Sequence, residues 1–370
     1  MNFEIKEKNN KARIGVFKTR RGDIETPFFM PDATRASVRG ITNEQLKSIG
    51  VQPMVVNTYH LLLQPGMELM RSAGGVHELM NWDYPLLSDS GGYQVYSLIH
   101  KNAKLGKITE EGAVFKSVLD GSKHLLTPEK AIQIQFDLGV DMMVLLDDPR
   151  PNDAPEKEIG HAVERTIRWA KRCKIEFEKQ VVERDFDDSS RPLLFAVVQG
   201  GPFVQLREKC AKELVKIGFD GYSFGGRHVD ESGEFMTEIV EKTASFMPED
   251  KPRFALGIGT PLDIVKCHNL GWDMFDCVIP TREGRHGRLF VFNDESISEK
   301  GDFYSTMNIA NAKFKNDFTP IDEGCDCYAC QNYTRGYLHH LFRVGEPLGA
   351  QMASLHNLRF FVQLMSKLQN

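Results

Sequence analysis

Four residues near the C-terminus have the types and spacing of a metal site. Cys325, Cys327 and Cys330 form a Cys-x-Cys-x-x-Cys run, and His356 follows them. Three thiolates and one imidazole are a ligand set that holds zinc in tetrahedral sites. Reduced thiols without a metal are the alternative, and another side chain or water could replace the histidine. Because a filled shell leaves no open position for chemistry, we expect a structural Zn²⁺ here, one per chain.

Two aspartates, Asp89 and Asp276, lie at the ends of short apolar runs. A charge beside an apolar strand needs a partner or a task. Two carboxyl groups that face one site allow one to attack an anomeric carbon while the other handles the leaving-group proton. A single aspartate at such a position more often caps a helix. Several runs end in this way, which favours a shared site: the residues are Asp89, Asp147, Gln199, Gly225, Gly226, Gly257 and Asp276.

Other residues at these ends predict how a planar ligand would be bound. Asp147 and Gln199 together offer hydrogen-bond donors and acceptors, which suits the edge of a heterocycle. In the stretch Ser88–Gln94, two glycines allow close approach of the backbone to a ligand, and a tyrosine offers a ring face. The pair Gly225-Gly226 could present bare backbone amides.

A basic segment follows the second aspartate directly. Residues 281–288 contain Arg282, Arg285 and Arg288 against the single acid Glu283, a local net charge of +2. In a chain with a formal net charge of −5, such a patch favours contact with phosphate groups. A solvated loop is the alternative interpretation.

The elements that must position these residues alternate regularly. Segments 156–180, 202–218 and 234–246 have helical spacing and lie between short apolar runs. Strands separated by helices predict a parallel sheet covered on both faces. Eight such units in about 260 residues predict a (β/α)₈ barrel, whose active site lies at the carboxyl ends of the strands. The predicted strands are Pro27–Pro31, Met54–Asn57, Leu86–Asp89, Met142–Asp147, Leu193–Gln199, Gly221–Gly226, Arg253–Gly257 and Met274–Pro280.

Two regions depart from plain alternation. Residues 93–127 contain turns and short strand-like pieces, which we interpret as an insertion after the third strand. Residues 301–370 carry the cysteine run and a helical tail, and we expect them to pack on a catalytic barrel of residues 1–300. The predicted fold class is α/β: a (β/α)₈ TIM barrel with a zinc-binding subdomain inserted near the C-terminus.

The composition argues against several classes of protein. No run approaches the roughly 18 apolar residues of a membrane span, and the first residues contain no apolar signal segment. Seven cysteines, an odd number, fit a reducing compartment better than a disulfide framework, so we expect a cytoplasmic protein. The 46 basic and 51 acidic residues argue against nucleic-acid binding by bulk charge and leave a local basic patch open.

Several separate motifs together resemble the tRNA-guanine transglycosylases of the bacterial type. Besides the cysteine run with its histidine, the motifs are Asn57–Leu61, Ser88–Gln94, Val197–Gly201 and Met274–Arg282. The resemblance covers essentially the whole chain. It implies a (β/α)₈ barrel with a zinc-binding insertion. It also implies a reaction in queuosine biosynthesis that exchanges guanine 34 at the anticodon wobble position of tRNA for a 7-deazaguanine, without cutting the RNA.

Carried over by motif, the resemblance assigns the chemistry to the two aspartates. Asp276 resembles the nucleophile that attacks C1′ of the ribose, and Asp89 resembles the general acid/base for the leaving and incoming bases. The residues similar to the family's base-binding positions are Ser90, Gly91, Gly92, Tyr93, Asp147, Gln199, Gly226, Arg227, Glu231 and Leu256. Those similar to its RNA-contacting loops are Gly257, Ile258, Gly259, Thr260, Pro261, Leu262, Asp263, Thr281, Arg282, Glu283, Gly284, Arg285 and Arg288.

The resemblance also implies partners. These are tRNAs with a GUN anticodon, guanine, the incoming base preQ1, and a second copy of the chain in a homodimer that the zinc region helps to build. The metal is structural in the family, and no metal takes part in the exchange.

Two stretches depart from the bacterial pattern and leave the incoming base open. Arg227–Glu231 replaces a usual Leu-Ala-Val-Gly-Glu run, and Asp-Pro at 148–149 replaces Glu-Cys after Asp147. Val229, which is glycine in queuine-using eukaryotic enzymes, favours preQ1, and Glu231 is expected to orient the loop that receives its aminomethyl group. The alternatives are queuine or preQ0 as the incoming base, a non-catalytic RNA-binding partner of such an enzyme, and a barrel hydrolase that acts on small glycosides.

Overall fold

The eight predicted strands form one nearly closed parallel barrel. The structure is a computed structural model that describes residues 2–294 and 296–370. The strand order is β4-β14-β13-β12-β11-β10-β6-β5, and a bridge between Asp32 and Val55 joins the two edge strands. There the amide of Ala33 donates to the carbonyl of Val55 at 2.7 Å. The strands are β4 (Phe28–Pro31), β5 (Met54–Asn57), β6 (Leu86–Asp89), β10 (Met142–Val144), β11 (Leu193–Val198), β12 (Gly221–Phe224), β13 (Arg253–Ala255) and β14 (Met274–Cys277).

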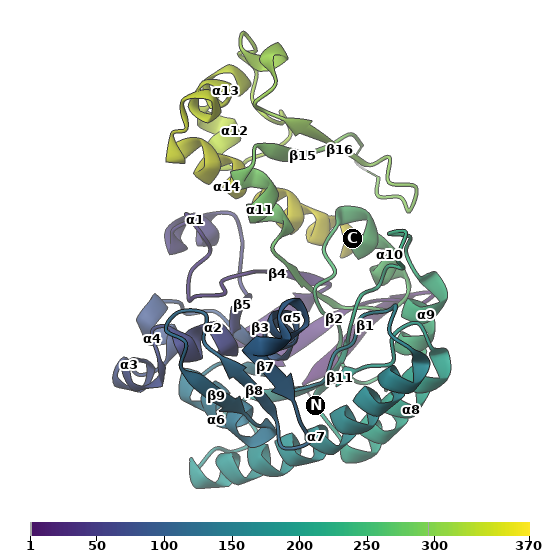
Figure 1. The fold of residues 1–370 in the computed structure, drawn as a ribbon. Coiled ribbons are helices and arrows are strands. Elements are labelled where there is room, and N and C mark those ends of the chain that lie inside the picture. Colours follow the sequence, from purple (N-terminus) through teal and green to yellow (C-terminus); the bar gives the residue numbers. More distant parts are fainter. Residues whose placement is uncertain (1, 295) are drawn as a thin grey trace.

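Helices cover the outside of this barrel (Figure 1). The three predicted helical segments are confirmed as α7 (Glu156–Glu183), α8 (Val204–Ile217) and α9 (Thr237–Ser245). In α7, Ile159, Val163 and Ile167 are buried, because their spacing places them on one face of the helix. The other helices on the barrel are α1 (Asn43–Ser48), α2 (Thr58–Leu63), α3 (Met67–Ser72), α4 (Val76–Met80), α6 (Pro128–Leu138) and α10 (Pro261–Asn269). None of the helices in the described part of the chain is long and apolar enough to cross a membrane.

An antiparallel sheet that the apolar runs did not predict covers one end of the barrel. Its strands are β1 (Phe3–Asn9), β2 (Ala12–Thr19) and β3 (Gly22–Thr26). Arg13 of β2 forms an ion pair with the buried Asp273 just before β14. Arg20 binds Asp141, just before β10, at 2.8 Å. These pairs place the sheet where the barrel strands begin, opposite their carboxyl ends.

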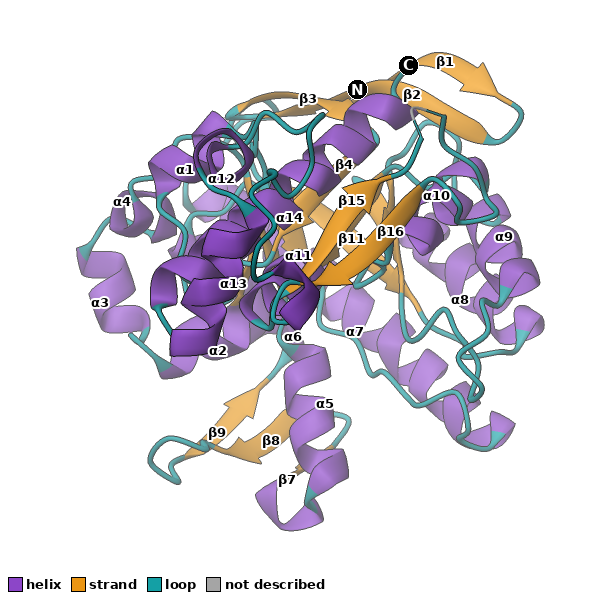
Figure 2. Cartoon of the chain, turned by 90° about the horizontal axis from the view of Figure 1, so that it is seen from above, coloured by secondary structure: helices purple, strands orange, loops and turns teal. Residues whose placement is uncertain are grey.

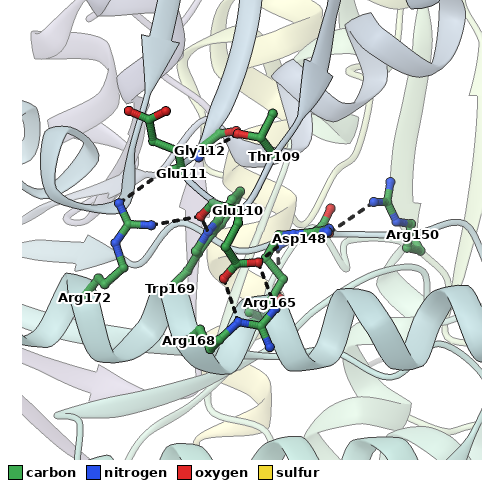
Figure 3. A network of polar contacts seen from close by, with 11 residues as sticks. Thr109, Glu110, Glu111, Gly112, Asp148, Arg150, Arg165, Arg168, Trp169 and Arg172 are labelled. Atoms are coloured by element: carbon green, nitrogen blue, oxygen red, sulfur yellow. Dashed lines mark hydrogen bonds and ion pairs between the residues drawn. The ribbon is translucent and has the colours of Figure 1, made fainter.

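The predicted insertion after the third barrel strand is a helix followed by a small antiparallel sheet, and it projects from the barrel (Figure 2). Its elements are α5 (Gly92–Lys101), the 3-10 turn η1 (Ala103–Leu105), β7 (Gly106–Ile108), β8 (Ala113–Lys116) and β9 (Lys123–Leu126). Several residues of α7 hold it through Glu110, namely Arg165, Arg168, Trp169 and Arg172 (Figure 3). The carboxylate of Glu110 accepts from Arg168 Nε at 2.6 Å, and its carbonyl accepts from the Trp169 indole at 2.8 Å.

The region after the last barrel strand leaves the barrel and returns to it. Its elements are α11 (Ile279–Arg285), β15 (Arg288–Phe292), β16 (Tyr304–Asn308), η2 (Ala312–Phe314), α12 (Tyr328–Asn332), α13 (Arg335–Val344) and α14 (Pro347–Leu368). Helix α14 packs on α11 and on β4. The rings of Phe361 and Phe29 lie 4.8 Å apart, and Asn357 Nδ2 donates to the Pro280 carbonyl at 3.0 Å. This helix therefore belongs to the outer layer of the barrel as well as to the tail, and a domain division at residue 300 stays a prediction.

Candidate active site

The carboxyl ends of the barrel strands surround two adjoining cavities. The first, of about 340 Å³, is lined by residues that include Asp147, Gln199 and Val229. The second, of about 250 Å³, is lined by residues that include Asp276 and Asn57. Four predicted site residues line both cavities, namely Asp89, Tyr93, Leu256 and Gly257. The structure thus brings together the strand-end residues that the sequence indicated.

Asp89 lies at the boundary of the two cavities. Asn57 Nδ2 donates to Asp89 Oδ2 at 2.9 Å. Burial raises the pKa of Asp89 to about 6, against the opposing effect of hydrogen bonds from the 90–94 loop. That loop comes close because Gly91 has a φ of 82° and a Cβ there would lie 2.6 Å from Cβ of Tyr59. A carboxyl with this pKa can both donate and accept a proton near neutral pH.

Asp276 lies in β14 with its carboxylate toward the second cavity. The amide of Gly257 donates to Asp276 Oδ1 at 2.6 Å. Burial raises the pKa of Asp276 to about 7, and the like charges of Asp89 and Asp32 raise it further. The Gly257 amide opposes these effects by binding the ionised form. The carboxylate is held in place while its second oxygen stays available as a nucleophile.

Asp147 and Gln199 form a polar pair in the first cavity. Gln199 Nε2 donates to Asp147 Oδ2 at 2.7 Å. Burial raises the pKa of Asp147 to about 7, with Asp89 adding a like charge. Gly225 is needed beside this pair, because a Cβ there would lie 2.4 Å from Gln199 Nε2. The remaining carboxyl oxygen of Asp147 and the amide oxygen of Gln199 offer a hydrogen-bonding edge to a planar ligand.

A buried arginine that the sequence did not single out positions the loops beside the first cavity, at the carboxyl ends of the strands (the barrel mouth). Arg207 of α8 donates to the carbonyls of Gly201 at 2.7 Å, Val198 at 3.2 Å and Gly225 at 3.1 Å. Its guanidinium lies 4.0 Å from the centre of the Phe224 ring. It therefore fixes the loops on both sides of the polar pair. In the sequence it looks like one more charge on an amphipathic helix.

The loop that departs from the bacterial pattern forms the outer wall of the first cavity. Arg227, His228 and Val229 line it. Asn152 Nδ2 donates to the carbonyls of Arg227 at 3.1 Å and Val229 at 3.0 Å. Glu231 is not brought to the cavity. It lies exposed on a turn, because Val229 pairs with Phe235 and turns the chain outward between them.

The predicted loop around Tyr93 contains both exposed and buried residues. The Tyr93 ring is 55% exposed and stands beside both cavities. Ser90 is buried, and its Oγ accepts from the Gly92 amide at 3.3 Å. The described cavity linings do not include Ser90, which stabilises the start of α5 instead.

The two segments expected to contact RNA also contain both buried and exposed residues. In the first, Ile258, Gly259 and Pro261 are buried, whereas Gly257 is exposed and Thr260, Leu262 and Asp263 are half-buried. Asp263 Oδ2 lies 3.1 Å from His228 Nε2, which ties this segment to the departing loop. In the second, Thr281 and Gly284 are buried, whereas Glu283 and Arg285 are half-buried and Arg282 and Arg288 are exposed.

A third hollow, here called the arginine cavity, adjoins the second cavity. It has a volume of about 580 Å³ and is lined by Arg35, Arg39, Arg285 and Asp32, among others. Asp32 also lines the second cavity. The sequence reasoning missed Asp32, because the predicted strand ended one residue before it. The rule that found the other strand-end aspartates would have found this one too.

Comparison with known proteins agrees with the geometry. The family described as queuine tRNA-ribosyltransferase matches residues 8–370. The protein of that name from Halothermothrix orenii is 44% identical over 368 residues, covering 100% of this chain and 92% of the relative. That from Idiomarina loihiensis is 43% identical over 370 residues, covering 100% and 92%. That from Caldanaerobacter subterraneus is 43% identical over 364 residues, covering 98% and 91%. The chain belongs to the queuine tRNA-ribosyltransferase family of enzymes.

This queuine tRNA-ribosyltransferase family member also has the predicted metal cluster. The ligand atoms of Cys325, Cys327, Cys330 and His356 all lie within 4.8 Å of one another, and all four residues are buried. His356 Nδ1 lies 3.3 Å from the Cys330 sulfur, and Nε2 lies 2.7 Å from the Phe290 carbonyl. An Nε2–H bond to that carbonyl leaves Nδ1 as the ligand atom, because metal-binding histidines donate their other ring N–H to a carbonyl or carboxylate. These residues fit a metal ion.

Proposed function

We propose that this protein is a tRNA-guanine transglycosylase that replaces guanine 34 of tRNAs with a GUN anticodon by the 7-deazaguanine preQ1. The observation that carries the proposal is the pair of carboxyl groups, Asp276 and Asp89, around one cavity that adjoins the Asp147–Gln199 edge. Membership of the queuine tRNA-ribosyltransferase family supports tRNA as the substrate and queuosine biosynthesis as the pathway. A cytoplasmic location follows from that role.

Asp276 acts as the nucleophile. Its ionised oxygen attacks C1′ of the target ribose, and the C1′–N9 bond breaks as the new C1′–O bond forms. The Gly257 amide, 2.6 Å from Oδ1, holds the carboxylate during the attack. The result is a covalent link between RNA and enzyme, in which the RNA backbone remains intact.

Asp89 handles the protons of both half-reactions. It gives a proton to the departing guanine and then takes one from the incoming base, whose nitrogen attacks C1′ and releases Asp276. A pKa of about 6 suits both steps. Asn57, 2.9 Å from Asp89 Oδ2, keeps the carboxyl oriented between the two cavities.

The first cavity binds the base after it leaves the anticodon stack. The Asp147 and Gln199 oxygens face its hydrogen-bonding edge, and the Gly226 backbone lies beside them. Tyr93 and Leu256, which line both cavities, pack against the faces of the ring. Base recognition therefore lies on the side of the mouth away from Asp276.

The incoming base is preQ1. Val229 fills part of the cavity wall where a larger 7-substituent would lie, and the carbonyl of Arg227 can accept a hydrogen bond from an aminomethyl cation. The Arg227 side chain is exposed, so its charge does not oppose that cation from within the cavity. Competition of preQ1, preQ0 and queuine for incorporation tests this choice, and faster incorporation of queuine would overturn it.

The RNA is held by the arginines around the mouth. Arg285 lines the arginine cavity, and burial together with the like charges of Arg39 and Arg282 lowers its pKa. These arginines repel one another, and a bound phosphate group would neutralise part of their charge. Arg285→Ala should weaken RNA binding and lower the slope of log affinity against log salt by about 1.

The metal is a structural Zn²⁺, and the tail around it forms a homodimer contact. Phe318 is 77% exposed and Tyr328 53% exposed on this tail, and the ring centres of Tyr333 and Tyr337 lie 5.2 Å apart nearby. Exposed aromatic clusters favour protein contacts. Sedimentation with and without a chelator tests this assignment, since zinc removal should give monomers.

An exchange assay tests the proposed function. tRNA carrying labelled guanine at position 34 should lose its label only when enzyme and preQ1 are both present, and the RNA should stay uncut. Release of label together with strand loss or free ribose would indicate a hydrolase. Binding of RNA without any exchange would indicate a non-catalytic partner.

A further inference from the structure

Asp32 is a further carboxylate at the barrel mouth, beside Asp89, Asp147 and Asp276, and the steps above do not use it. It follows β4, where Pro31 pairs with Cys277, the residue after Asp276. On its other side Asp32 bridges to Val55 of β5. It therefore lies between the strand of the nucleophile and the strand that leads to Asn57, the partner of Asp89.

Asp32 lines both the second cavity and the arginine cavity. It lines the second cavity with Asp89 and Asp276, and it lines the arginine cavity with Arg39 and Arg285. A nucleotide that places its base in the first cavity and its phosphates at the arginines must pass its sugar by Asp32.

The local backbone does not explain a charge at this position. Asp32 Oδ1 accepts from the Thr34 amide at 2.7 Å and from the Thr34 hydroxyl, a turn that asparagine forms equally well. Within residues 2–294 and 296–370, no donor binds Oδ2 and no lysine or arginine forms an ion pair with Asp32. Its charge also opposes ionisation of Asp276 and Asp89. Its charge raises the pKa of Arg285 in the arginine cavity, but no ion pair joins the two side chains. A charge with this cost and no direct cationic partner in the described residues indicates a ligand.

We propose that Asp32 accepts a hydrogen bond from the 2′-hydroxyl of the target ribose and so selects RNA over DNA at the exchanged nucleotide. The proposal rests on the transglycosylase function. In a β-nucleoside the 2′-hydroxyl lies on the sugar face opposite the base, and that is the face which Asp276 attacks. A carboxylate beside Asp276 is therefore placed to reach this hydroxyl, and the free Oδ2 is the acceptor.

The test uses two anticodon stem-loop RNAs that differ only in the 2′ position of guanine 34, ribose or deoxyribose. Wild-type enzyme should prefer the ribose substrate by about 10- to 100-fold in kcat/KM, the size expected for one hydrogen bond to a charged group. Asp32→Val should exchange the ribose substrate only as fast as the deoxyribose one. Asp32→Asn, which keeps the contacts to Thr34, should retain a reduced preference.

A matched control removes the same charge at the opposite end of the barrel. Asp23 of β3 is exposed there, and Asp23→Val should keep the wild-type preference. An undiminished preference in Asp32→Val, or no preference in the wild type, would overturn the role of Asp32. If Asp32→Val does not fold, Asp32→Asn decides, and an unchanged preference in that variant overturns the proposal. Failure of the wild type to exchange guanine in the ribose substrate would instead reject the transglycosylase function.

Discussion

The barrel mouth and the Cys₃His cluster are both buried polar sites, yet they are built in opposite ways. At the mouth, burial raises the pKa values of Asp89, Asp147 and Asp276 and leaves oxygen atoms facing a cavity. At the cluster, the four ligand atoms face one another, and the second nitrogen of His356 binds a backbone carbonyl. Carboxyl groups with shifted pKa values that face a cavity suit catalysis, whereas a closed shell of metal ligands suits folding.

The largest expected effect is on catalysis at the mouth. Asp276→Asn should lower guanine exchange by about 10⁴-fold or more, because the amide cannot form the covalent link. RNA binding should persist, since the arginines are untouched. Exchange assays and RNA titrations on the same sample measure both, with Asp23→Asn as the control for loss of an acidic charge. Activity in Asp276→Asn above a tenth of the wild-type value would remove Asp276 from the nucleophile role.

Loss of the metal should affect the tail and leave the carboxylates at the barrel mouth in place. Binding of zinc to such a shell provides an apparent free energy on the order of 10 kcal/mol, and Cys330→Ser or a chelator removes much of it. Hydrogen exchange should then speed up in residues from about 301 to 345, while β10 and β11 stay protected. Any dimer should dissociate. Loss of guanine exchange would contradict a purely structural metal if the tail stayed protected from hydrogen exchange and the dimer stayed intact.

The pH dependence of exchange should report the raised pKa values. Asp276 must be ionised to attack and Asp89 must hold the proton that it gives to guanine, so with pKa values of about 7 and about 6 kcat/KM should pass through a maximum between pH 5.5 and 7.5 and fall on both sides. The apparent values belong to the coupled set that includes Asp89 and Asp147. A flat profile over this range would show that neither the ionisation of Asp276 nor the protonation of Asp89 limits the reaction there.

The smallest effect is on stability, and its sign is opposite to that on activity. The folded state keeps the Asp276 proton up to about pH 7, whereas the unfolded chain loses it near 3.8. Stability therefore falls as pH rises from about 4 to about 7. Asp276→Asn should raise Tm by about 2 °C at pH 8 and leave it unchanged at pH 4. A lower Tm at pH 8 would show that the carboxylate stabilises the fold.

The sequence predicted the barrel because its strands are buried on both faces and appear as continuous apolar runs. It did not predict β1–β3, because a strand such as β1 is mostly exposed and charged and contains no continuous apolar run. It pointed to Asp89 and Asp276 because each ends an apolar run. It could not show that Arg207 is buried, or that pairing of Val229 with Phe235 carries Glu231 away from the cavity. Those facts depend on contacts between distant loops.

The barrel mouth should form a covalent bond to the ribose, and the metal cluster should take no part in it. Wild-type enzyme mixed with stem-loop RNA and a large excess of preQ1 can be quenched in denaturant, digested, and examined by mass spectrometry. We expect an RNA adduct on the peptide that contains Asp276, present after metal removal if the barrel stays folded, and absent in Asp276→Asn. An adduct on Asp89, or rapid exchange with no adduct at any quench time, would contradict this expectation.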